Sequence, residues 1–84
     1  METYKLQKGD EQFVYFMEHD DHESYALCVY EGRNQNGDYV FRSWLYGWKY
    51  IVNKEKTKVT WVDRKETKEF AISTHNGWLR YFPN

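Results

Sequence analysis

The chain has 84 residues, 20% of them aromatic, and a formal net charge of −1 at pH 7. This length supports one hydrophobic core and excludes two, so we expect residues 1–84 to form a single compact domain. The lone Cys28 excludes an intrachain disulfide, and no segment has the roughly 20 apolar residues of a membrane helix or a secretory signal, so we expect a cytoplasmic protein without membrane contacts.

A period of two in apolar and aromatic residues predicts β-strands along the chain. In chain order, the runs of strand length are EQFVYFM, SYALCVYE, DYVFRSW, KYIVN, KVTWVD and WLRYF. Turn-like clusters separate them, and the Asn-Gly pairs at 36–37 and 76–77 are typical of tight hairpin turns. Together these elements predict an all-β fold, a small antiparallel barrel or sandwich of about five to seven short strands.

The segment over residues 64–72 fits two secondary structures. Asp63 and Glu66 have the D-x-x-E spacing of a helix start, and KETKEFAIS could continue as a short helix. Against this, Phe70 and Ile72 alternate as they would on one face of a strand. We expect a strand here, with the short helix as the alternative.

The segment SWLYGWKY, residues 43–50, places aromatic rings at every second position around Gly47. In a regular strand these rings would share one inward face, whereas a bulge or bend at the glycine would turn one pair outward. We expect the break, and with it a partner-binding surface, because Tyr and Trp are enriched at contact hot spots. The predicted contact residues are Trp44, Tyr46, Trp48, Lys49 and Tyr50.

The first predicted strand carries bulky side chains on both faces. Phe13, Tyr15 and Met17 oppose Val14 and Phe16, and a fold this small cannot bury all of them. We therefore expect some aromatic side chains to be exposed or covered by a partner. A second copy of the chain, in a homodimer, is one form that this partner can take.

Charge is distributed unevenly along the chain. Residues 1–31 carry eight acidic and two basic residues, whereas residues 32–84 carry ten basic and five acidic ones. Such halves indicate either two surfaces for different partners or two layers that attract each other. The cluster EHDDHE contains metal-ligand types, but its spacing matches no metal motif, so we expect a solvated acidic patch of Asp20, Asp21 and Glu23 and no metal.

Single-stranded nucleic acid is the alternative partner. Basic and aromatic residues interleave in the second half of the chain, a combination with which small β-folds hold single strands. The candidate contacts are Arg42, Lys54, Lys56, Lys58 and Trp61. A protein partner is preferred because acidic residues interrupt this stretch and the pI is about 6.3, whereas dedicated nucleic-acid binders usually have a clear basic excess.

The sequence contains no convincing catalytic motif. It has no glycine-rich phosphate loop and no compelling Ser-His-Asp order, and Cys28 lies in an apolar strand-like run. We therefore expect a non-catalytic binding module without a cofactor, which binds and occludes or regulates a protein partner. An aromatic pocket for a small ligand or nucleotide is the third hypothesis. Small proteins of this composition are common among phage and plasmid products that inhibit host machinery, and this analogy supports the first hypothesis.

Overall fold

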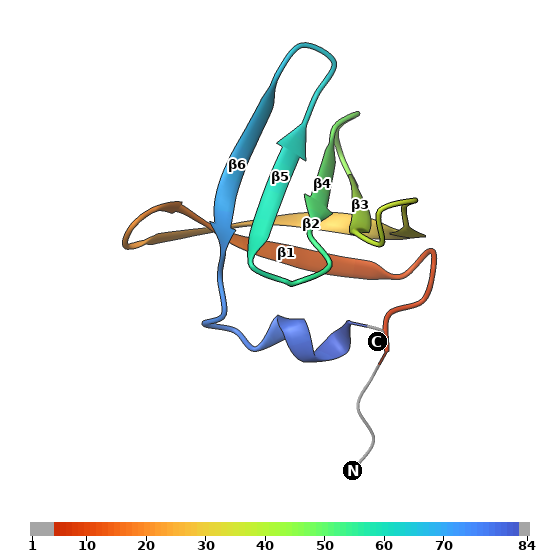
Figure 1. Ribbon diagram of the computed structural model, residues 1–84, viewed down its shortest axis with the longest axis horizontal. Helices are drawn as coiled ribbons and strands as arrows, with labels where there is room; N and C mark the ends of the chain where they lie inside the picture. The colour runs from red at the N-terminus through yellow and green to blue at the C-terminus, as the bar shows by residue number, and fades with distance from the viewer. Residues whose placement is uncertain (1–4, 83–84) are drawn as a thin grey trace.

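The computed structural model describes residues 5–82, which form a closed antiparallel barrel of six strands (Figure 1). Each strand pairs with the next one in the chain, and β6 pairs with β1. The strands are β1 (Glu11–His19), β2 (His22–Arg33), β3 (Tyr39–Ser43), β4 (Lys49–Val52), β5 (Lys58–Val62) and β6 (Thr67–Ile72), and the 3₁₀ helix η1 (Trp78–Tyr81) follows them. The all-β prediction is confirmed, and of the two predicted architectures the chain adopts the barrel.

β1 and β2 form a long hairpin from which the shorter strands rise, and η1 lies along the other side of β1 (Figure 1). Because β3, β4 and β5 are antiparallel neighbours, the loop over residues 44–48 and the loop over residues 53–57 lie at opposite ends of the barrel. Within the described residues, no helix is long and apolar enough to cross a membrane.

The barrel interior is filled by every second side chain of the strands, as the period of two requires. Trp78 and Phe82 come from the segment after β6, and their rings pack against Phe41 at centroid distances of 6.3 and 5.6 Å. The buried core residues are Leu6, Val14, Phe16, Cys28, Tyr30, Tyr39, Phe41, Tyr50, Val52, Val59, Trp78 and Phe82. Seven of these are aromatic, which explains how so short a chain fills a barrel without a disulfide.

The segment over residues 64–72 contains the strand β6, so the alternative of a short helix is wrong. β6 pairs with β5 from Lys58↔Ala71 to Val62↔Thr67. The D-x-x-E spacing belongs to the turn between these strands, where the Asp63 amide donates to the Glu66 carbonyl at 3.0 Å. Pairing with β5 on one side and β1 on the other outweighs the local helix signal.

The two Asn-Gly pairs have different structures. Gly37 closes the β2–β3 loop with a φ of 85°, as expected for a hairpin turn. Gly77 also has a positive φ, of 63°, but it precedes η1, so the strand predicted for WLRYF is wrong. The pairing of β1 with β6 already closes the barrel before this segment begins. The segment folds back onto the barrel, where the indole N–H of Trp78 donates to the Ser73 carbonyl at 2.8 Å.

Candidate functional site

The aromatic segment SWLYGWKY is divided between two strands and a loop. β3 ends at Ser43, residues 44–48 form the loop, and β4 begins at Lys49. The loop is closed by the Ser43 amide, which donates to the Trp48 carbonyl at 2.9 Å, and by the Ser43 hydroxyl, which accepts from the Tyr46 amide at 3.1 Å. The break that the sequence suggested near Gly47 is therefore a complete reversal of the chain rather than a bulge.

The loop exposes apolar side chains beside the outer face of the β1–β2 hairpin. Trp44, Leu45 and Tyr46 are 52%, 72% and 56% exposed. The Trp44 amide donates to the Leu27 carbonyl at 3.0 Å, which holds the loop next to β2. Phe13 lies opposite Leu27 in the β1–β2 register, so both side chains lie on the same face of the hairpin.

These side chains surround one hollow of about 480 Å³, which we call the aromatic hollow. Among the side chains whose burial the structure describes, in residues 5–80 and at Phe82, every large hydrophobic one that is exposed lines it, namely Phe13, Tyr25, Leu27, Trp44, Leu45 and Tyr46. Ala26, Ser43, Trp48 and Tyr50 complete the lining, so none of the lining residues is charged. The hollow is an apolar, aromatic surface in contact with solvent.

The predicted contact residues take different positions around this hollow. Trp44 and Tyr46 are exposed on its rim, and Tyr46 stacks on the half-buried Trp48 at 4.2 Å. Lys49 lies outside it and forms an ion pair with Glu31 at 3.1 Å. Tyr50 is buried in the core, with only 7% of its surface exposed.

Four residues that line the hollow are not among the contact residues predicted from the sequence: Phe13, Tyr25, Leu27 and Leu45. The bulky groups on both faces of the first strand were the available signal, because one of those faces had to remain outside the barrel. The structure places Val14 inside and Phe13 outside, and Phe13 packs edge-on against Tyr25 at 5.6 Å.

Trp48 has an unusual environment for a buried indole. Its Nε1 is buried and has no hydrogen-bond partner among the described residues. Burial raises the pKa of the Tyr50 hydroxyl, and the nearby Trp48 N–H opposes this rise without meeting the geometry of a hydrogen bond. Buried polar groups are usually paired, and this N–H, buried next to the Tyr50 hydroxyl, is an exception among the described residues.

The basic residues of the nucleic-acid alternative do not form one groove. Arg42 donates to Glu31 at 3.1 Å and Lys58 lies 3.4 Å from Glu69, so both have acidic partners. The remaining lysines, Lys54 and Lys56, lie in the loop at the opposite end of the barrel from residues 44–48. Trp61 is half-buried on β5, where it pairs with Tyr50 in the register and contacts Trp48.

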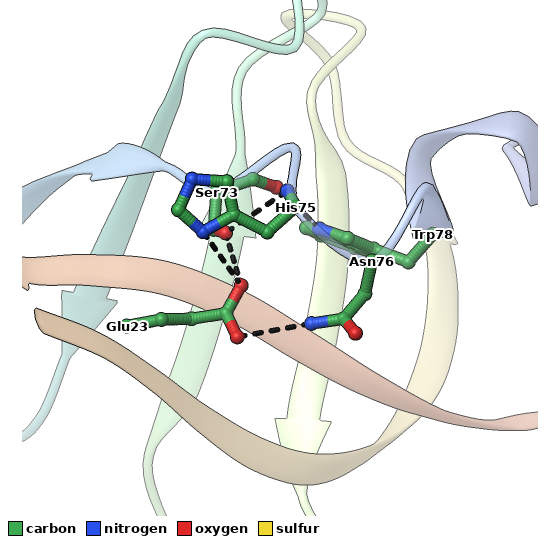
Figure 2. A network of polar contacts seen from close by, with 5 residues as sticks. All are labelled: Glu23, Ser73, His75, Asn76 and Trp78. Atoms are coloured by element: carbon green, nitrogen blue, oxygen red, sulfur yellow. Dashed lines mark hydrogen bonds and ion pairs between the residues drawn. The ribbon is translucent and has the colours of Figure 1, made fainter.

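The three residues of the predicted acidic patch also lie in different environments. Asp20 and Asp21 are exposed at the β1–β2 turn, whereas Glu23 is half-buried and reaches toward the segment after β6 (Figure 2). The Glu23 carboxylate accepts hydrogen bonds from the Ser73 hydroxyl and from the Asn76 side-chain amide, the latter at 2.9 Å. Within residues 5–82, no group of three or more His, Cys, Asp and Glu side chains is arranged to hold a metal ion.

Glu23, Ser73 and His75 are the residue types of a hydrolase triad, but their arrangement is different (Figure 2). Ser73 is 1% exposed, and its hydroxyl donates a hydrogen bond to the Glu23 carboxylate. His75 Nδ1 lies 3.9 Å from the same carboxylate, whereas a nucleophilic serine needs the histidine as its own base. We call Glu23, Ser73 and Asn76 the Glu23 latch, because they tie β2 to the segment that leads to η1.

Comparison of the chain with protein-family models, with curated proteins and with solved structures finds no match. The function is therefore argued from the geometry and chemistry of the site itself.

Proposed function

We propose that this chain is a non-catalytic binding domain whose aromatic hollow receives an apolar segment of a protein partner. The observation that supports this most is that six large hydrophobic side chains, all those described as exposed in residues 5–80 and at Phe82, surround one hollow. Monomeric proteins usually scatter such side chains, and a contiguous apolar patch marks an interaction site. Trp and Tyr are also enriched among the few residues that carry most of the binding energy at protein interfaces.

The charged groups beside the hollow support a protein partner over nucleic acid. Arg42 and Lys49 directly flank the loop, and both form ion pairs with Glu31. This cluster places charged side chains beside the loop that lines the hollow, and charged or polar groups bordering an apolar centre are usual at a protein interface. A phosphate backbone would instead require unpaired cations along a groove.

Single-stranded nucleic acid stays the alternative partner of the same rings. The volume of about 480 Å³ also suits a small organic ligand, since pockets for such ligands range from roughly 300 to 1,000 Å³. In the experiment below, nucleic acid gives an adduct that nuclease treatment removes, and a small ligand gives no protein adduct.

The experiment places a photo-crosslinking amino acid at position 45 or at position 35. Leu45 lies on the rim of the hollow, whereas Gln35 is exposed in the β2–β3 loop and serves as the matched control. We expect a discrete protein adduct from position 45 in lysate of the native host and none from position 35. Trp44→Ser, at an exposed rim position, should reduce the yield at least about fivefold without changing the melting temperature, since it removes one aromatic anchor.

The other outcomes are equally informative. An adduct formed by the purified protein alone identifies a second copy of the chain as the partner. Loss of the adduct after nuclease treatment identifies nucleic acid as part of the complex. Equal labelling from both positions, or no adduct from position 45, contradicts the proposal.

A further inference from the structure

A second hollow, of about 240 Å³, shares Trp48 and Tyr50 with the aromatic hollow. Five aromatic side chains form its lining, and we call it the Trp61 cage: Phe16, Trp48, Tyr50, Trp61 and Phe70. The rings contact one another at centroid distances of 4.8 Å for Phe16–Phe70, 5.7 Å for Phe16–Tyr50 and 5.5 Å for Trp48–Trp61. The rings form an electron-rich hollow that is open to solvent, and they come from β1, β4, β5, β6 and the loop before β4.

Two charged side chains complete the cage. Lys68 places its Nζ 5.6 Å from the centroid of the Trp61 ring, which is a cation–π contact. Glu18 lies beside it, and a hydrogen bond from Ser24 lowers the pKa of this carboxyl; desolvation opposes this effect, and the charge of Lys68 adds a smaller lowering. The Glu18 carboxylate is therefore ionised at neutral pH, and the protein's own ammonium group already lies at the aromatic wall.

We propose that the Trp61 cage binds an alkylated ammonium group, which displaces Lys68 from the face of Trp61. Aromatic faces together with a carboxylate are the chemistry that recognises quaternary ammonium ions. The exposed position of Lys68 on β6 lets its side chain move into solvent when another cation enters. This inference goes beyond the proposed function and does not depend on a partner at the aromatic hollow.

The size and the chemistry of the cage select this ligand class over others. A volume of about 240 Å³ is below the roughly 300 Å³ at which pockets for drug-sized ligands begin, so the cage suits a headgroup rather than a nucleotide. A primary ammonium loses hydrogen bonds to water that aromatic rings cannot replace, whereas a trimethylammonium has none to lose.

The test measures binding of choline to the purified protein by nuclear magnetic resonance of the tryptophan indole N–H groups. The matched neutral probe is 3,3-dimethylbutan-1-ol, which has the same shape as choline and no charge. We expect saturable shifts with choline and at least about tenfold weaker binding of the neutral alcohol, because the cation–π attraction requires the charge. Equal binding of the two probes would overturn the proposal.

Three variants test the roles of the named side chains. Lys68→Met removes the competing ammonium while keeping the length of the side chain, and should tighten choline binding by about threefold or more. Glu18→Gln should weaken it by a similar factor, and Trp61→Leu by about tenfold or more. Lys65→Met, at an exposed position in the β5–β6 loop, is the control and should leave the affinity unchanged.

The gain of affinity in Lys68→Met is the decisive readout, because a merely structural role of Lys68 does not predict it. If Lys68→Met binds choline no more tightly than the unmodified chain, the proposal is wrong. A peptide that contains trimethyllysine then separates the two sources of the headgroup: tighter binding than choline assigns it to a modified protein, and equal binding assigns it to a small free cation. Trp44→Ser should not alter choline binding, so failure of the cage and failure of the aromatic hollow are distinguishable.

Discussion

Cys28 shows how the position of one residue in the barrel determines its chemistry. It is fully buried, and its Sγ donates to the Ala26 carbonyl at 3.6 Å. Burial raises the pKa of this thiol from 9.0 to about 12. Because the thiolate is the reactive form, Cys28 is an inert member of the core.

We therefore predict that a disulfide reagent such as DTNB labels Cys28 at pH 8 at least about a hundredfold more slowly in the folded protein than in guanidinium chloride. The absorbance of the released thiolate gives both rates. The raised pKa of Cys28 also affects folding stability. Between pH 9.0 and about 12 the thiol ionises in the unfolded chain but not in the folded one, so the free energy of unfolding falls as the pH rises through this range. Equal labelling rates in the two conditions would show that the thiol is accessible in the folded state.

At the level of single residues, the sequence predicted part of the site. The exposure of Trp44 and Tyr46 follows from a chain reversal that Gly47 suggested. The burial of Tyr50 and the exposure of Phe13 could not be predicted, because alternation does not identify the inner face when both faces carry bulky groups.

Among the elements, one group of ion pairs joins β2, β3 and β4. We call it the Glu31 cluster, and it consists of Glu31, Arg42 and Lys49. Partial burial by itself would raise the pKa of Glu31, but hydrogen bonds from Lys49 and Arg42 bring it below the ordinary 4.5. The cluster is partly exposed, so its contribution at neutral pH is about 0.5–1 kcal/mol.

This contribution is present above the unfolded pKa of Glu31 and is lost as the pH falls through the lower folded value. We predict that the melting temperature of the unmodified chain falls more steeply from about pH 5 to pH 3 than that of Glu31→Gln. Glu55→Gln, at an exposed loop position, is the control and should follow the unmodified chain. Parallel curves for Glu31→Gln and the unmodified chain would exclude this role.

The Glu23 latch joins β2 to the segment before η1 across about fifty positions of the chain. We predict that Glu23→Ala lowers the free energy of unfolding by about 1–3 kcal/mol, because it leaves the buried Ser73 hydroxyl without its acceptor. Urea titration followed by tryptophan fluorescence measures this loss. Asp21→Ala removes an exposed acid from the same hairpin and should change the value by less than about 0.5 kcal/mol.

The alternation of apolar residues predicted the strands well where each run could pair with the next run along the chain. β1 to β5 coincide with the apolar runs in the sequence, whereas WLRYF has the same local pattern as a strand and is η1. The difference lies in the environment, because β6, the strand before this segment, already pairs with β5 on one side and with β1 on the other. The residues WLRYF by themselves therefore do not show that they form a 3₁₀ helix rather than a strand.

For the whole molecule, the opposite charges of the two halves are partly explained by attraction within one barrel. The acidic half contributes Glu31 and the basic half contributes Arg42 and Lys49 to the same cluster. The alternation of apolar residues also could not predict that the barrel closes. β1 and β6 are distant in sequence, and their register contains only the pairs Phe16↔Ile72 and Met17↔Ala71. A sandwich would satisfy the same alternation, and this seam decides between them.

Closure of the barrel also limits how any ligand can compete for the aromatic hollow. Since β3 and β4 each pair with a strand on both sides, a partner at the loop over residues 44–48 cannot add a strand to either of them and meets side-chain surfaces there. A competitor therefore needs no peptide backbone. A compact aromatic compound that fills the space between the β1–β2 hairpin and residues 44–48 would be a starting point for a chemical inhibitor of this domain.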